Sequence, residues 1–356
     1  MKYHLCMKLL PSNYYCSQDG RRFDILKIVL AIFVVAIHTT TMDFFLRPIL
    51  RIAVPIFFIM TSYFFFLNQK KMNSYQEKKK ALIKFSKRYL LLYLFWFIVL
   101  LPITVICRKW YVNFGFETLI NVIKCFLFSS TFRASWFLTA SLINIVFVWW
   151  ASRKISDIWL IVLGLLFYFP CCLFSNYNNI VENENVIESY IKYASCFSTP
   201  YNSFPVALLF IMFGKIMAEK SILFSNRKII FYLIMSIISL YIEFYIIQYN
   251  HLFLFDDCYL SLVPSSFLIF MLIGQNHITI SFPTREIRKC STIIYCCHAS
   301  IASCVNGVLT IMGGQRMSAT IYYGCMFMIT LLISFWVYTF IQQLCKNYSR
   351  LVKWAY

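Results

Sequence analysis

Charged residues are scarce in this chain of 356 residues. They make up 13% of the sequence, whereas 60% of its residues are hydrophobic. A soluble domain carries about a quarter of its residues as Asp, Glu, Lys or Arg, so this composition argues against a soluble fold. Apolar segments long enough to cross a bilayer recur along the chain, and they predict an all-α, polytopic integral-membrane helical bundle.

Several signatures of other protein classes are missing as well. The 14 cysteines do not show the spacing of a metal site, and most lie in apolar runs, where a thiol packs as a small hydrophobic group. We therefore expect no bound metal. The sequence contains no internal repeat and no glycine-rich phosphate-binding loop. No small-residue cleavage site follows the first apolar run, so we expect this run to remain as a membrane anchor.

Acidic residues are few, and the 33 basic residues against 14 acidic ones give a net charge of +19. The basic residues gather in short loops between apolar runs, which is the pattern that sets membrane orientation, and we expect no nucleic acid partner. A cytoplasmic amino terminus places most of them on one side, together with the carboxyl terminus. The basic stretches on that side are both tails and residues 68–88, 153–154, 215–228 and 275–289.

The hydrophobic pattern predicts about ten spans flanked by a basic cytoplasmic tail at 1–22 and a second tail at 346–356, with the membrane domain over 23–345. Segment 116–130 is too short for a span and is predicted as an interfacial or re-entrant helix. Stretch 175–200 is the longest polar outer loop and is expected to touch a large external substrate. The predicted spans are 23–43, 47–67, 85–106, 135–152, 156–174, 203–219, 229–248, 258–274, 290–312 and 319–344.

The first predicted span carries three ionisable residues, Asp24, Lys27 and His38. Such groups are rare in lipid and mark a function or a buried pair. At about 100° per residue, Lys27 and His38 share one helix face with about 20° of offset, and they lie about 16 Å apart along the axis. Asp24 is close enough in register to pair with Lys27. The pair either helps two spans to pack or lines a path that leads to His38.

Four stretches, read in order, resemble the acyltransferase 3 family of membrane proteins, which includes O-antigen and peptidoglycan O-acetylases. Ser62 stands where this family usually has glycine. Together the stretches span most of the chain, and the ordered set is far more specific than any one of them. They are Lys27-x10-His38 preceded by Asp24, Arg51–Phe58 followed by Thr61-Ser62-Tyr63, Ser135–Leu138, and Ser291 with Tyr295 and His298.

The resemblance, together with side-chain chemistry, assigns catalytic candidates. A neutral imidazole at His38 can take the proton of an acceptor hydroxyl as its oxygen attacks a thioester. A lone histidine is otherwise more often structural, and the ordered motifs favour the base. Lys27 with Asp24 would organise the donor path. Arg51 would hold the substrate or a developing oxyanion, or alternatively extend to the outer headgroups.

A basic cluster precedes the third predicted span and resembles the basic stretch of the family, although Leu92 stands where proline is frequent. Its residues Lys84, Lys87 and Arg88 would bind the phosphates of coenzyme A, or would only orient the chain and attract anionic lipids. A second set is expected to line the substrate cavity with His38, with packing within the bundle as the alternative. This set is Trp136, Tyr295 and His298.

The resemblance implies a membrane O-acyltransferase that moves an acetyl group from acetyl-coenzyme A, as co-substrate, to a hydroxyl of a cell-surface or exported polysaccharide. It further implies a place in the bacterial cytoplasmic membrane beside polysaccharide-biosynthesis proteins. Two alternatives stay open. One is transfer of succinyl or another acyl group by the same fold. The other is a non-enzymatic glycan exporter, for which the sequence offers no inverted repeat and no matching pair of broken spans.

Overall fold

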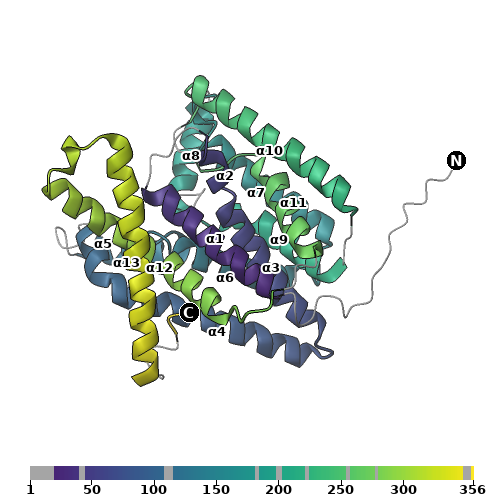
Figure 1. Cartoon of the computed structure of the whole chain (residues 1–356). Helices are drawn as coiled ribbons and strands as arrows, with labels where there is room; N and C mark the ends of the chain where they lie inside the picture. The colour runs from purple at the N-terminus through teal and green to yellow at the C-terminus, as the bar shows by residue number, and fades with distance from the viewer. Residues whose placement is uncertain are drawn as a thin grey trace.

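A computed structural model of the chain describes residues 20–39, 45–107, 115–180, 184–197, 203–220, 224–253, 257–276, 280–347 and 354–356. These residues form α-helices and two short 3₁₀ segments, and no strand occurs among them (Figure 1). The helices are α1 (Gly20–Thr39), α2 (Arg47–Leu50), α3 (Ala53–Lys70), α4 (Tyr75–Cys107), α5 (Phe116–Phe128), α6 (Trp136–Ala151), α7 (Asp157–Leu173), α8 (Glu184–Phe197), α9 (Phe204–Lys220), α10 (Asn226–Tyr249), α11 (Leu262–Gln275), α12 (Arg285–Ile311) and α13 (Ala319–Asn347).

The predicted all-α membrane bundle is confirmed. Each predicted span coincides with a helix, and α5 occupies the segment that was predicted as an interfacial or re-entrant helix. Among the described residues, five helices are both long and apolar enough to cross a membrane: α2 with α3, α4, α10, α12 and α13. Helices α6, α7 and α11 are apolar but shorter, at 14 to 17 residues. Ten spans are therefore not confirmed.

Three loop and tail predictions need correction. The predicted basic loop 68–88 is helical at Asn68–Lys70 and again from Tyr75 onward, so six of its eight basic residues lie on α4. The predicted outer loop 175–200 contains α8, an amphipathic helix. Helix α1 begins at Gly20 and so includes two of the basic residues assigned to the tail. Residues 1–19 of the first tail and 348–353 of the second lie outside the described part of the chain.

The centre of the bundle is α9, which is buried along almost its whole length and packs on α3, α6 and α7. Gly214 allows the closest approach, because a Cβ at this position would overlap the carbonyl oxygen of Ile59 on α3. Ser62 on α3 packs against α9 at the same place. Its side chain is fully buried, and its hydroxyl donates a hydrogen bond to the carbonyl of Ile211 at 2.6 Å. A serine at the position where the family has glycine is therefore still small enough for this contact.

Replacing Gly214 by alanine should destabilise the bundle by about 1–3 kcal/mol, since the added methyl group meets the backbone of α3 and the two helices must move apart. Gly307→Ala on α12 is the matched control, because nothing lies within 4 Å of a Cβ there. We expect a lower thermal midpoint only for Gly214→Ala when the purified proteins are unfolded in the same detergent. Equal midpoints for the two variants would contradict the close packing of α3 and α9.

The amino-terminal end of α1 is hydrogen-bonded to the ends of two other helices, α11 and α12. Arg22 is buried and donates hydrogen bonds to the carbonyls of Gly274, at 2.8 Å, and Asn276, at the carboxyl end of α11. Such carbonyls lack a partner within their own helix. Asp24, also buried, accepts a hydrogen bond from the Thr284 hydroxyl at 2.7 Å, just before α12. These contacts fix the position of α1, which runs through the bundle in Figure 1.

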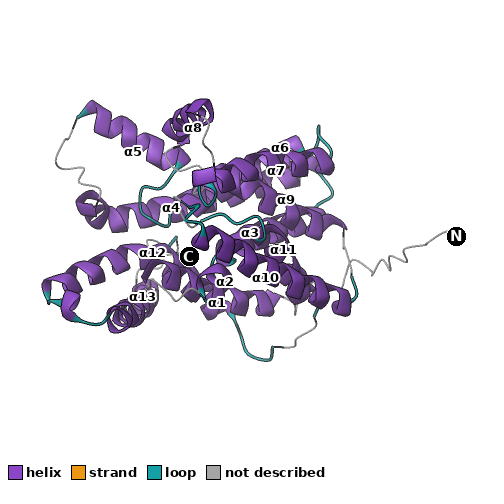
Figure 2. Cartoon of the chain, turned by 90° about the horizontal axis from the view of Figure 1, so that it is seen from above, coloured by secondary structure: helices purple, strands orange, loops and turns teal. Residues whose placement is uncertain are grey.

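Helix α12 packs on α1, α4 and α13. At one end of the bundle in Figure 2, α4 and α5 lie on one side and α12 and α13 on the other. The far end of α1 reaches the same region. Residues of α1, α4, α12 and α13 line a cavity in this region.

Candidate functional site

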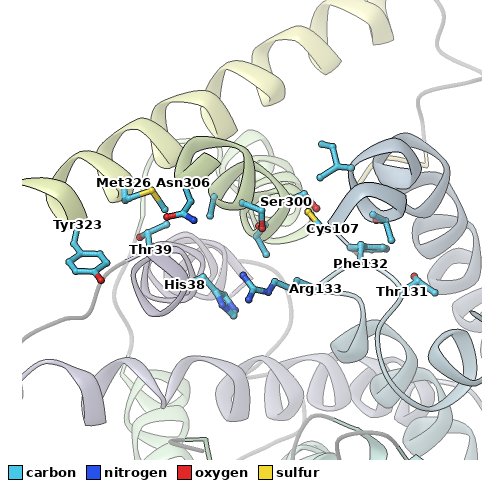
Figure 3. A pocket seen from close by; sticks show the side chains of 15 residues that line it. His38, Thr39, Cys107, Thr131, Phe132, Arg133, Ser300, Asn306, Tyr323 and Met326 are labelled. Atoms are coloured by element: carbon cyan, nitrogen blue, oxygen red, sulfur yellow. The ribbon is translucent and has the colours of Figure 1, made fainter. Parts of the chain in front are cut away.

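His38 lies in the last turn of α1, and its exposed side chain lines two cavities. The large cavity has a volume of about 710 Å³ and the small cavity about 250 Å³. Arg133, in the segment between α5 and α6, lines both cavities as well. Its side chain extends toward the His38 ring in Figure 3, and its charge acts on that ring. The imidazole therefore faces a hollow beside a cation.

The large cavity is rich in hydrogen-bonding groups. Its walls come from α1, α4, α12, α13 and the segment between α5 and α6. Hydroxyl, amide and guanidinium groups of this kind can hydrogen-bond a polyhydroxylated molecule at many points. The polar side chains in its lining are His38, Thr39, Thr104, Thr131, Arg133, Ser300, Ser303, Asn306 and Tyr323.

The small cavity has an apolar wall, and polar side chains line it as well: His38, Arg51, Ser129, Ser130, Arg133 and Asp257. Trp136 and Tyr295 line it, and the Tyr295 hydroxyl donates a hydrogen bond to the carbonyl of Ala134 at 3.3 Å. The remaining apolar wall residues are Val34, Ile37, Val54, Pro55, Phe58, Ala134, Val206, Phe210, Cys258 and Leu262. The apolar wall can pack against a short acyl group.

Arg51 enters the small cavity from the turn between α2 and α3. Pro55 lacks the amide that would bond the Arg51 carbonyl, which favours a helix break at this point. The guanidinium forms an ion pair with Asp257, with 2.6 Å between Nη1 and Oδ1, and both side chains are one-fifth exposed. Arg51 thus points into the bundle rather than toward lipid headgroups. Its charge also acts on His38.

His298 lines neither of these cavities. It is fully buried on α12, and its ring lies behind that of His38, with 5.2 Å between the ring centroids. His38, Arg51, Trp136 and Tyr295 therefore all line the small cavity. His298 is buried behind His38 and does not line it.

Lys27 and Asp24 lie away from these cavities, toward the other end of α1. Lys27 makes no ion pair with Asp24 among the described residues; its ammonium lies 5.5 Å from the centre of the Phe64 ring. Asp24 bonds Thr284 instead. The i, i+3 spacing permitted a pair, but the buried hydroxyl supplies the carboxylate with another partner. Lys27 lines neither of the two cavities that His38 lines.

A third cavity, of about 250 Å³, is strongly basic, and we call it the basic pocket. The charges of Arg88 and Arg288 act on Lys27, so the pocket lies at that end of α1. Lys84 and Lys87 are exposed on α4 and do not line it. The lining residues are Arg88, Arg285, Arg288, Lys289, Thr292, Trp354 and Tyr356.

Residues 354–356 form one wall of the basic pocket. The buried Trp96 indole donates a hydrogen bond to the Ala355 carbonyl at 3.0 Å, and the Lys289 ammonium lies 4.9 Å from the centre of the Tyr356 ring. The pocket thus combines several cations with two aromatic side chains. Phosphate groups and a planar base are the ligand parts that such a lining fits.

Sequence reasoning missed several charged residues of these sites. No site role was predicted for Arg133, although it stands two residues before the Ser135-Trp136 motif, and this closeness was the available signal. Asp257 was given no role. Arg285 and Arg288 were taken only as orientation charges, and no local pattern connects them with Arg88, about 200 residues earlier in the chain.

Comparison with known proteins gives one match. The family model described as an acyltransferase domain matches residues 21–339, which is nearly the whole chain and includes all three cavities except the two aromatic residues of the basic pocket. No curated protein and no solved structure matches the chain.

Proposed function

The chain belongs to the acyltransferase 3 family of membrane proteins, and from this premise we propose that it is an O-acetyltransferase that acetylates a cell-surface or exported polysaccharide. Acetyl-coenzyme A is the proposed donor. One observation carries the proposal: the His38 ring is exposed to both the large cavity and the small cavity, beside the charges of Arg51 and Arg133.

In the proposed reaction, the sugar hydroxyl lies in the large cavity and the acetyl group in the small one. His38 takes the hydroxyl proton as the oxygen attacks the thioester carbonyl carbon. Arg51 and Arg133 stabilise the negative charge that develops on the carbonyl oxygen. The carbon–sulfur bond then breaks, and the departing thiolate receives the proton from His38. The products are an acetyl ester of the sugar and free coenzyme A.

The basic pocket supports an anionic donor at the opposite end of α1. Arg88, Arg285, Arg288 and Lys289 would bind the phosphates, and Trp354 would contact the adenine. Because basic residues favour the cytoplasmic side, this pocket would face the compartment that makes acetyl-coenzyme A, in the cytoplasmic membrane of a bacterium. His38, which lies about 16 Å further along α1 than Lys27, would then be toward the outer side.

The test is an assay of the purified protein in lipid nanodiscs with acetyl-coenzyme A that carries a labelled acetyl group. We expect the label to appear on a polysaccharide in an alkali-labile ester, with one free thiol released per acetyl group. Use of succinyl-coenzyme A but not acetyl-coenzyme A would replace the proposed donor and keep the acyltransferase. Glycan movement across vesicles without thioester consumption would favour an exporter instead.

Arg288→Ala is expected to raise the KM for the donor by about 10- to 150-fold and to leave kcat nearly unchanged, because a charge-assisted hydrogen bond to a phosphate contributes about 1.5–3 kcal/mol. Lys228→Ala removes an exposed cation at the start of α10 and serves as the control. Lys84→Ala tests the assignment made from sequence. If Lys84→Ala raises the KM and Arg288→Ala does not, the donor binds along the exposed face of α4 and not in the basic pocket.

A further inference from the structure

His298 has an unusual pattern of hydrogen bonds for a fully buried histidine. Its Nδ1 lies 2.7 Å from the carbonyl oxygen of Tyr295 and 3.2 Å from that of Ile294. Its Nε2 is buried and has no hydrogen-bond partner among the described residues. A buried polar atom without a partner costs free energy, so one in a native protein calls for an explanation.

The two carbonyl contacts determine the tautomer of this ring. A carbonyl oxygen only accepts hydrogen bonds, so Nδ1 of His298 must carry the proton. In a neutral imidazole the other nitrogen then has a free lone pair. The Nε2 of His298 is therefore an acceptor, fixed in place by the backbone of α12.

The His38 ring lies next to this acceptor. The centroids are 5.2 Å apart and the ring planes are inclined by 36°, which leaves room for one N–H···N hydrogen bond when a nitrogen of each ring faces the other. The other charged groups that act on His38 are Arg51, beside α3, and Arg133, before α6, and neither can accept a hydrogen bond.

We infer that His298 is a positioning residue for His38, and this inference rests on the proposed function. Its Nε2 accepts the N–H of the His38 ring when the substrates are bound. The bond directs the unprotonated nitrogen of His38 toward the two cavities, where the acceptor hydroxyl lies. It also stabilises the imidazolium that forms when His38 takes the hydroxyl proton. His298 neither touches the substrate nor receives the transferred proton.

Two isosteres separate this role from a purely structural one. A glutamine amide oxygen reaches the place of Nε2 and can accept the His38 N–H, whereas an asparagine amide nitrogen replaces Nδ1 and its bonds to the α12 carbonyls. We expect His298→Asn and His298→Leu to lower kcat by about 10- to 100-fold at unchanged KM values, as losing such a supporting group often does. His298→Gln should keep kcat within about threefold of the original protein, since it restores the acceptor.

The outcomes are distinct. Rescue by asparagine and not by glutamine would show that His298 acts only through its bond to α12, and equal loss or equal activity in both variants would also overturn the inference. The kcat values are compared only between variants whose thermal midpoints agree. If wild-type protein transfers no acyl group, or His38→Ala transfers normally, the proposed function itself fails.

A second measurement does not depend on the folding of any His298 variant. In protein labelled with ¹⁵N-histidine, which contains five histidines, the unprotonated nitrogen of His298 should show a hydrogen bond in the presence of a non-hydrolysable donor analogue. This signal should be lost in His38→Ala. Its persistence in His38→Ala would overturn the inference.

Discussion

Replacing His38 by alanine is expected to lower kcat for acyl transfer by about 10²- to 10⁴-fold, the range that a general base contributes. The cavity would remain, because the side chain is exposed in it and supports no hydrogen bond of the fold that the structure shows. Donor and acceptor should therefore still bind, and KM should change little. The measurement is transfer of labelled acetyl by equal amounts of folded protein.

His251→Ala is the control for this variant. It removes the same side chain from an exposed turn at the end of α10, away from all three cavities. We expect full activity from it. If His38→Ala transferred acetyl at the rate of His251→Ala, His38 could not be the base, and the hydroxyl would have to be activated by another group.

Most of the fold could be predicted from the sequence because hydrophobic length is a local property. The apolar runs gave α6 and α9 to within a residue or two at each end. The errors fall where a basic stretch was predicted to be a loop: the lysines at the start of α4 are part of its helix. Lysine is a good helix former, so a helix can begin within a basic stretch that precedes a span.

The site could be predicted only in part. The ordered motifs identified His38 and Arg51, which the structure places at one cavity. They could not identify Asp257, because its contact with Arg51 joins residues 206 positions apart and has no local signature. The basic pocket could not be predicted for the same reason. Arg88 on α4 lies near Arg285 and Arg288 on α12 only because the two helices pack together.

Arg51→Ala is expected to lower kcat by about 10²- to 10³-fold if the guanidinium stabilises the oxyanion, as for other groups of this kind. The substitution also leaves Asp257 without its cation in a mostly buried place, so a loss of stability is expected as well. Activity and thermal midpoint should therefore both fall, and the single variant does not separate the two effects.

The double variant Arg51→Ala with Asp257→Asn separates them. Removing the unpaired carboxylate should restore much of the thermal midpoint, because no uncompensated charge is left at the ion-pair site. Transfer should nevertheless stay as slow as in Arg51→Ala, since the cation beside the thioester carbonyl is still missing. Recovery of transfer together with stability would mean that Arg51 only ties the α2–α3 turn to the segment before α11. In that case Arg133 would be the one cation left beside His38 among the described residues that line its cavities.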